Sequence, residues 1–397
     1  MVAAWLQRHN EMPYVHDHGK DWHTNGRTNM RIGFVAEDFI LTNGKLRPSG
    51  CSYYRCLLPK NTLRGLPTEF GPPAYTAEHG FGVRTSKQEA RFGFDVIVMK
   101  MLMSRWIPDQ MRQAQELGQV IVVDVDDYYP GLHESNLAFE ATDPNKNPIT
   151  NREHYHNVIM AADWVTVTTP FLHEYYSQFR DNVVMIRNGI NPEQFVKRKV
   201  RNTKPVLGWA GAIKWRSNDV ETAREWLPDL LEEHDLLFHH AGDMEDAPKF
   251  ADLAGVNPDR MILTPMRPLH EYHEMLDFDI GIVLLSDIPF NEAKSTIKGL
   301  EYAASNIPFV ANDMPEYALL AQQGVGRVAA DGDEFVAHIK QLLDYNTRKV
   351  EAATMRNLAI KDHGIQARAK EWAEFYAQFA NHKSSIRNII AEYRFLG

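Results

Sequence analysis

The sequence predicts an α/β protein with two Rossmann-like domains, for three reasons. Short apolar segments alternate with segments of helical periodicity, a pattern typical of parallel sheets covered by helices. The 397 residues, 44% of them hydrophobic, are enough for two cores. A polar, basic segment in the middle of the chain is typical of an interdomain linker. The expected divisions are an arm (1–30), an N-terminal domain (31–195), the linker (196–204), a C-terminal domain (205–365) and C-terminal helices (366–397).

The composition indicates a globular protein of a reducing compartment. The formal net charge is −9 and the pI is near 6.0, without the overall basic signature of nucleic-acid-binding proteins. Cys51 and Cys56 are too few for a disulfide framework or a zinc site. The first thirty residues lack the apolar core of a signal peptide, and no apolar run reaches the ~18 residues of a membrane span. We therefore expect a cytoplasmic location and, at most, peripheral contact with a membrane.

Apolar segments predict the strands of the first domain. The third of these ends in Asp124, Asp126 and Asp127, and such crowding of carboxylates is costly without a function or good solvation. Thr169 and Pro170 are suited to cap the helix that follows the fourth strand. The strands are expected at 31–36, 95–99, 118–127, 162–170 and 182–186, and a helix is expected at 106–117.

The second domain begins with a strand that delivers Gly211 to a loop carrying Lys214 and Arg216. Asn218 or Asp219 is expected to cap the helix after this loop. Helical patterns dominate the end of the chain, where aromatic residues gather on one face. Further strands are predicted at 236–241, 261–263, 280–285 and 307–311.

The stretch 288–304 predicts a site for a nucleotide diphosphate. Its Pro/Asn turn follows a buried strand and leads into a helical pattern starting near Lys294. The first turn of such a helix offers free backbone N–H groups, and Lys294, Ser295 and Lys298 add charge and a hydroxyl there. Glu301, two turns further along the same face, can accept hydrogen bonds from a ribose diol. The plain alternative is a solvated helix face.

Motifs within this stretch, just after it and near the end of the first domain resemble those of the GT-B glycosyltransferases, in particular those like family 4, including bacteriophage-encoded versions. The matching segments are Glu-Tyr-Ala-Ala at 301–304 and Ile-Pro-Phe-Val at 307–310, together with an Asn-Gly-Ile-Asn turn at 188–191. The resemblance covers about residues 31–380. It implies two Rossmann-like domains that face each other across a cleft, with C-terminal helices crossing back to the first domain.

The resemblance implies a glycosyltransferase whose co-substrate is a nucleotide-diphosphate sugar of the UDP or GDP type. It implies no other cofactor, no metal and retention of the anomeric configuration. A second Glu that is usual in the family is absent, because Ala293 stands eight residues before Glu301. The residues implied at the donor diphosphate are Gly211, Lys214, Arg216, Lys294, Ser295 and Lys298, and Glu301 is implied at the ribose.

The acceptor is expected on the first domain. Residues 45–112 hold eleven Lys and Arg against five Asp and Glu, with aromatic residues interspersed. Such a segment can grip a phosphate backbone and stack on bases, so a hydroxymethylated DNA base is one candidate acceptor. A surface glycan, a lipid-linked sugar and a protein hydroxyl are the alternatives. The residues expected on the acceptor side are Gly50, Arg47 and Arg55, and those expected to orient the acceptor as catalytic groups are Asp126 and Asp127.

Three other interpretations are open. Asp124-Val125-Asp126 matches the Asp-x-Asp metal motif of the GT-A glycosyltransferases, although a second complete βα half follows, which those enzymes lack. A sugar-nucleotide epimerase of GT-B-like fold would keep the donor site and need no acceptor. A Rossmann oxidoreductase would need a G-x-G-x-x-G fingerprint after the first strand, and Gly33 and Gly50 do not form one.

Overall fold

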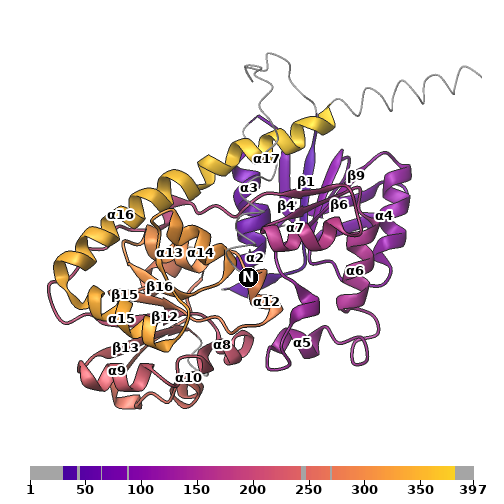
Figure 1. The fold of residues 1–397 in the computed structure, drawn as a ribbon. Coiled ribbons are helices and arrows are strands. Elements are labelled where there is room, and N and C mark those ends of the chain that lie inside the picture. Colours follow the sequence, from indigo (N-terminus) through magenta and orange to yellow (C-terminus); the bar gives the residue numbers. More distant parts are fainter. Residues whose placement is uncertain are drawn as a thin grey trace, which may run out of the picture. The chain divides into compact units, whose positions relative to one another are not determined.

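A computed structural model describes residues 30–380 apart from 43–44, 64, 87–88, 243–246 and 269–270 (Figure 1). The expected arm, except Met30, and the expected C-terminal helices after residue 380 lie outside the described residues. The chain divides into two compact units. Unit 1 comprises Met1–Val125, Glu153–Ile186 and Ala369–Gly397, and unit 2 comprises Asp126–Arg152 and Arg187–Arg368.

Unit 1 is built on a six-stranded sheet in which all neighbouring strands are parallel. Strands β1 and β8 consist entirely of buried residues, as expected for apolar runs in a sheet covered on both faces. The five predicted strands are confirmed, and β4 is an additional edge strand that the sequence reading missed. The order is β11 (Val183–Met185), β10 (Trp164–Val167), β9 (Val120–Val125), β8 (Val96–Lys100), β1 (Ile32–Ala36) and β4 (Thr68–Gly71).

Unit 1 also holds two small antiparallel sheets that the sequence reading did not predict. One pairs β2 (Phe39–Thr42) with β3 (Lys45–Pro48), and the other joins β5 (Pro73–Thr76), β6 (Gly80–Arg84) and β7 (Ala90–Arg91). The start of α7 is capped as predicted, because Thr169 Oγ1 accepts a hydrogen bond from Leu172 N–H at 3.4 Å. The helices are α2 (Gly50–Ser52), the π-helical turn η1 (Tyr53–Leu57), α3 (Leu58–Thr62), α4 (Ile107–Glu116), α6 (Arg152–Ala161) and α7 (Pro170–Ser177).

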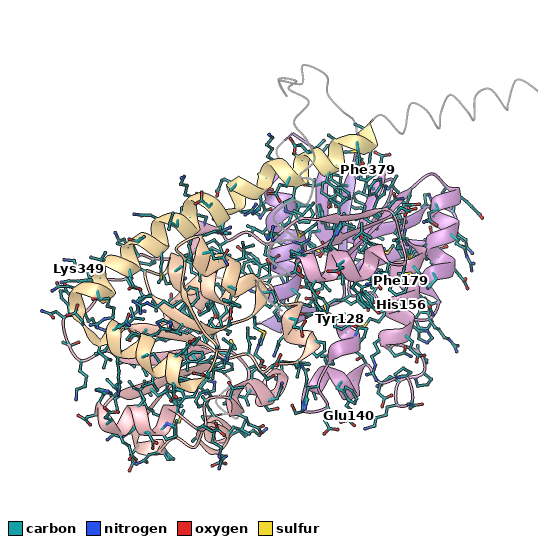
Figure 2. The ribbon with its side chains drawn as sticks, viewed as in Figure 1. Tyr128, Glu140, His156, Phe179, Lys349 and Phe379 are labelled. Atoms are coloured by element: carbon teal, nitrogen blue, oxygen red, sulfur yellow. The ribbon has the colours of Figure 1, made fainter. Side chains whose placement is uncertain are left out.

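Helix α17 (Ile365–Ala380) belongs to unit 1 from Ala369 onward. Trp372 and Tyr376 are buried, and the Tyr376 ring lies edge-on to Phe34 of β1, with ring centroids 5.9 Å apart. Phe379, labelled in Figure 2, meets Trp164 of β10 at 6.0 Å in the same manner. The aromatic face noted in the sequence is therefore the face that completes the apolar core of this unit.

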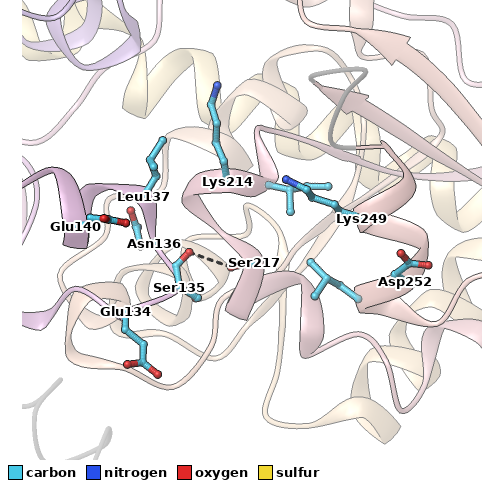
Figure 3. A pocket seen from close by; sticks show the side chains of 11 residues that line it. Glu134, Ser135, Asn136, Leu137, Glu140, Lys214, Ser217, Lys249 and Asp252 are labelled. Carbon is cyan, nitrogen blue, oxygen red and sulfur yellow. Dashed lines mark hydrogen bonds between the residues drawn. The ribbon is translucent and has the colours of Figure 1, made fainter.

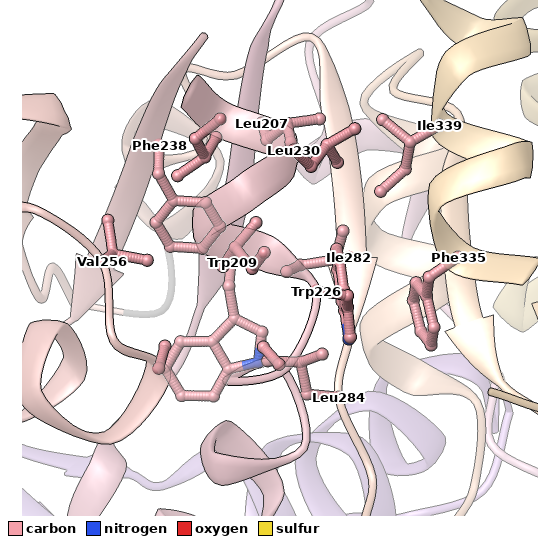
Figure 4. Packing of buried hydrophobic residues seen from close by; sticks show 14 of the residues in the cluster. Leu207, Trp209, Trp226, Leu230, Phe238, Val256, Ile282, Leu284, Phe335 and Ile339 are labelled. Carbon is pink, nitrogen blue, oxygen red and sulfur yellow. The ribbon is translucent and has the colours of Figure 1, made fainter. Parts of the chain in front are cut away.

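Unit 2 repeats the plan of a six-stranded parallel sheet. Its core, shown in Figure 4, centres on Trp209 of β12, with Trp226 stacked on Phe335 at a centroid distance of 4.8 Å. The predicted strands are confirmed, and β17 is an additional edge strand. The order is β14 (Met261–Pro265), β13 (Leu237–Gly242), β12 (Val206–Ala210), β15 (Ile280–Val283), β16 (Phe309–Asn312) and β17 (Arg327–Ala329).

The longer helices of unit 2 cover this sheet, and shorter turns connect its strands. None of the described helices is both long enough and apolar enough to cross a membrane. The helices are η2 (Tyr129–Gly131), α5 (Leu137–Ala141), η3 (Pro192–Gln194), η4 (Ile213–Trp215), α8 (Ser217–Glu221), α9 (Leu227–Glu233), α10 (Ala247–Ala254), η6 (Pro258–Arg260), α11 (Tyr272–Met275), α12 (Pro289–Glu292), α13 (Ile297–Ala304), α14 (Pro315–Gln322), α15 (Gly332–Leu343) and α16 (Tyr345–His363).

A buried ion pair stabilises the core of unit 1. Arg55 of η1 and Asp124 of β9 have no exposed side-chain surface, and Arg55 Nη2 lies 2.7 Å from Asp124 Oδ2. Arg55 also donates to the carbonyl oxygen of Ile186 at 2.7 Å, and its guanidinium lies over the Trp372 ring. Thr166 Oγ1 donates to the same Asp124 carboxylate at 2.6 Å. Both side chains are therefore structural.

Two expectations are corrected by this ion pair. Arg55 was expected on the acceptor side, but a side chain without exposed surface cannot contact an acceptor. Asp124 was a candidate metal ligand in the Asp-x-Asp interpretation, but its carboxylate oxygens accept hydrogen bonds from Arg55 and Thr166. The sequence could not reveal this, because the partners are 69 residues apart.

Arg55→Met is expected to destabilise the protein by about 3–5 kcal/mol, because it leaves a buried carboxylate without its counter-ion. Arg112→Met is a matched control, since Arg112 and Asp109 form an ion pair in which both side chains are about 70% exposed, and such pairs contribute within ~1 kcal/mol. Urea unfolding followed by circular dichroism measures both. Equal stability losses in the two variants would contradict the structural role of Arg55.

Candidate functional site

Two side chains of α13 form hydrogen bonds with the carboxyl end of β12. Lys298 Nζ donates to the carbonyl oxygen of Ala210 and lies 5.0 Å from the centre of the Trp209 ring. The Tyr302 hydroxyl accepts a hydrogen bond from Ala210 N–H at 2.9 Å. A Cβ atom at Gly211 would lie 2.9 Å from the Trp209 ring and 3.2 Å from Lys298 Nζ. A side chain at Gly211 would therefore crowd the Trp209 ring and the Lys298 ammonium, so the predicted glycine is required at this position.

The helix predicted to start near Lys294 begins three residues later, at Ile297, and a separate short helix, α12, occupies the predicted Pro/Asn turn before it. Helix α12 ends at Glu292 and α13 begins at Ile297, so Lys294 and Ser295 lie in the connection between them. Lys298 is consequently the lysine that shares a helix face with Glu301, three residues further on.

The ammonium group of Lys298 is destabilised by its surroundings. Burial and, to a smaller extent, the positive charges of Arg216 and Lys294 lower the pKa of Lys298 to about 7. The carboxylates of Glu301 and Asp219 offset part of this effect. A bound anion would favour the protonated form of Lys298, so the ammonium would carry its full charge and attract the anion.

Glu301 is buried, with 6% of its surface exposed, and has a partner that the sequence did not indicate. The Tyr272 hydroxyl of α11 hydrogen-bonds to the Glu301 side chain. Burial raises the pKa of Tyr272, and the negative charge of Glu301 raises it further, so Tyr272 stays a donor. The carboxylate is thus oriented on the same face of α13 as Lys298.

Lys294 forms an ion pair within unit 2. Its Nζ lies 2.6 Å from Asp127 Oδ1 and 4.0 Å from the centre of the Phe290 ring. A Cβ atom at Gly131 would lie 2.7 Å from the backbone nitrogen of Phe290, so η2 packs closely on α12. The predicted diphosphate lysine and the predicted catalytic carboxylate are therefore partners. Asp126, the other predicted carboxylate, is half-buried directly after β9.

Ser295 and the segment 187–191 meet in unit 2. Asn188 Nδ2 donates to Ser295 Oγ at 2.9 Å, and Arg187 Nε lies 3.1 Å from Glu316 Oε2. Ile190 N–H donates to the carbonyl oxygen of His363 at 3.0 Å. The Asn-Gly-Ile-Asn turn of the sequence motif therefore supports the loop that carries Ser295.

Arg216 and Asp219 lie at the start of α8. The helix begins at Ser217 with Arg216 before it, so the prediction that Asn218 or Asp219 caps it is wrong. Asp219 has 2% of its surface exposed, and its Oδ2 lies 3.6 Å from Arg216 Nη1. Arg216 is close enough to Lys298 to influence its charge, so the loop after Gly211 brings a second cation to the site.

Lys214 lines a cavity of about 500 Å³ in unit 2 (Figure 3). Lys249 of α10 also lines this cavity and is labelled with Lys214 in Figure 3. Ser217 Oγ donates to the carbonyl oxygen of Ser135 at 3.2 Å, which joins the walls. The predicted contact of Lys214 with a diphosphate stays a prediction. The other lining residues are Glu134, Asn136, Leu137, Glu140, Ile213, Asp252 and Leu253.

The remaining acceptor-side candidates lie in unit 1. Gly50 begins α2, and a Cβ atom there would meet nothing among the described residues within 4 Å. Ser52 N–H donates to Asp38 Oδ2 at 3.1 Å, and the hydroxyls of Ser49 and Ser52 donate to the same carboxylate. Arg47 is half-buried in β3. Asp38 thus orders the loop that contains Gly50.

The chain is similar to several glycosyltransferases. No protein-family model matches it. It is 25% identical over 244 residues to TuaH of Bacillus subtilis (strain 168), a glycosyltransferase assigned to teichuronic acid biosynthesis, and the match spans 57% of each chain. The chain thus covers little more than half the length of this curated relative.

Solved structures extend the similarity to most of the chain. Anabaena HepE in complex with UDP is 13% identical, with a TM-score of 0.58 over 88% of this chain and 100% of the other. Sucrose-phosphate synthase from Thermosynechococcus elongatus is 12% identical, with a TM-score of 0.59 over 88% and 98%. Both are GT-B glycosyltransferases. With two six-stranded parallel sheets and these similarities, the chain has the GT-B fold, and its resemblance to the GT-B glycosyltransferases is confirmed.

Proposed function

We propose that the protein is a glycosyltransferase that moves a sugar from a nucleotide-diphosphate sugar to an acceptor hydroxyl. One observation carries the proposal: Lys298, Arg216 and Glu301 converge beside Gly211 at the carboxyl end of β12. Ligands of open α/β sheets bind at strand carboxyl ends, and two cations beside one carboxylate suit a diphosphate joined to a ribose. The complex of HepE with UDP supports a uridine nucleotide as the donor.

In this proposal, Lys298 and Arg216 bind the diphosphate and Glu301 accepts hydrogen bonds from the ribose. Cleavage of the sugar–phosphate bond leaves negative charge on the terminal phosphate, and fixed cations stabilise that charge in the transition state. Lys294 leaves its ion pair with Asp127 and binds a phosphate oxygen instead, and the Ser295 hydroxyl also contacts the diphosphate. The released Asp127, or Asp126 beside it, then orients the acceptor hydroxyl. Retention of configuration rests on the resemblance, and the anomeric coupling in the product's NMR spectrum tests it.

UDP binding is expected to weaken as the pH rises above about 7. Lys298 is half-deprotonated near that pH in the free protein, and a bound diphosphate raises its pKa, so binding takes up a proton. Calorimetry at pH 8 in phosphate and in Tris should give enthalpies that differ by the difference between the ionisation enthalpies of the two buffers, multiplied by the number of protons taken up.

Two variants test this assignment. Lys298→Met should bind UDP roughly tenfold or more weakly and show no proton uptake, because the titrating group is gone. Lys340→Met is the matched control, since it removes a lysine of α15 that pairs with Glu233 at 3.0 Å. Proton uptake that persists in Lys298→Met would show that another group titrates and would remove Lys298 from the proposal.

Activity is expected to persist in the presence of EDTA. The proposed site supplies three cationic side chains, Arg216, Lys294 and Lys298, which take the place of a divalent ion at the diphosphate. The measurement is the release of UDP from UDP-glucose, and then from other UDP-sugars, in the presence and absence of chelator. Loss of turnover that manganese restores would instead require carboxylate ligands at the donor site.

For the acceptor, we propose a hydroxyl of a surface polysaccharide, because the curated relative TuaH is assigned to teichuronic acid biosynthesis. The DNA alternative loses support, since Arg55 is buried and cannot contact a phosphate backbone. Transfer of labelled sugar to isolated cell-wall glycan should be detected, while gel shifts with hydroxymethylated DNA at low salt should show no complex. A salt-sensitive DNA complex with sugar transfer to its bases would reverse this choice. Isomerised sugar without any acceptor would indicate an epimerase.

A further inference from the structure

A single buried carboxylate joins three segments around the proposed donor site. Asp219 Oδ1 accepts hydrogen bonds from Ser286 N–H and Ser286 Oγ, both at 2.9 Å, and from Asn291 Nδ2 at 2.6 Å. Its other oxygen, Oδ2, lies 3.6 Å from Arg216 Nη1. Ser286 follows β15, Asn291 belongs to α12 and Arg216 precedes α8.

We propose that Asp219 is a positioning residue of the donor site, which holds Arg216, the connection after β15 and α12 in the arrangement that receives the diphosphate. The inference rests on the proposed function and deepens it. Asp219 does not touch the donor in this proposal, because 2% of its surface is exposed. It acts through the groups that do.

The chemistry of the network requires a carboxylate at this position. Three donors converge on one oxygen, and a cation faces the other, so every partner needs an acceptor or a negative charge. An asparagine of equal size would present N–H groups on one side and leave Arg216 without its counter-ion. A buried carboxylate is costly unless it is satisfied in this way, so a purely space-filling role is a poor explanation.

Asp219 also acts on Lys298 through charge. The groups that influence the Lys298 ammonium come from several elements: Arg216 before α8, Asp219 in α8, Lys294 between α12 and α13, and Glu301 in α13. Asp219 raises the pKa of Lys298, against the lowering caused by burial and by the two cations. Neutralising Asp219 should therefore move the titration of Lys298 to lower pH, an effect that packing alone would not produce.

The test compares Asp219→Asn with Ser286→Ala in the full chain. Ser286→Ala removes the hydroxyl that donates to Asp219 and accepts from Asn218 and Asn291, and it keeps the carboxylate charge, so it is the matched control. UDP affinity is measured by calorimetry from pH 6 to pH 9. We expect Asp219→Asn to bind UDP about tenfold more weakly at pH 7 and to shift the midpoint of the pH dependence downwards by on the order of one pH unit. Ser286→Ala should keep the wild-type midpoint.

The inference is overturned when the wild-type protein binds UDP but Asp219→Asn has the same affinity and midpoint, or when Ser286→Ala shifts the midpoint equally. If Asp219→Asn does not fold, as judged by circular dichroism, the comparison is made with Asp219→Glu. That variant keeps the charge on a longer side chain, so a wild-type midpoint with reduced affinity is expected and unchanged affinity overturns the inference. Absence of UDP binding by the wild-type protein is a distinct outcome, which rejects the proposed function and this inference with it.

Discussion

The structure of the candidate site depends on one unfavourable charge. Lys298 is held between the Ala210 carbonyl, the Trp209 ring and the backbone of Gly211, where burial brings its pKa down to about 7. A lysine whose charge is destabilised in this way is rarely kept without a task, because a shorter or neutral side chain would avoid the cost. The groups around the half-buried Lys298 side chain are closely packed.

The close packing around Lys298 comes from the way α13 lies on the sheet of unit 2. A Cβ atom at Gly281 of β15 would lie 2.5 Å from the Tyr302 ring, and one at Gly299 would lie 2.6 Å from the Phe309 ring. The two glycines therefore let helix and sheet approach closely, which fixes the direction of Lys298 and Glu301 on the helix. Gly281 and Gly299 therefore position the side chains of the candidate site without contacting a ligand themselves.

Local sequence patterns predicted the alternating architecture, Gly211 and the face of α13 that carries Lys298 and Glu301, because each is encoded within a few neighbouring residues. They could not predict partners distant in sequence. Lys294 pairs with Asp127, 167 residues away, and Arg55 pairs with Asp124. The predicted helix start at Lys294 and the predicted cap at Asp219 were both wrong, and Asp219 instead accepts hydrogen bonds from the distant Ser286 and Asn291.

The charges of the site explain why a ligand would change the protonation of the protein. Three cations are matched by three carboxylates: Arg216 by Asp219, Lys294 by Asp127, and Lys298 by Glu301. A diphosphate adds negative charge to this nearly balanced set, and only two responses keep the balance. Lys298 can take up a proton, because its pKa lies close to neutrality, or Asp127 can release Lys294 to a phosphate. Asp219 is buried and stays paired with Arg216, so the response to the diphosphate comes from Lys294 and Lys298.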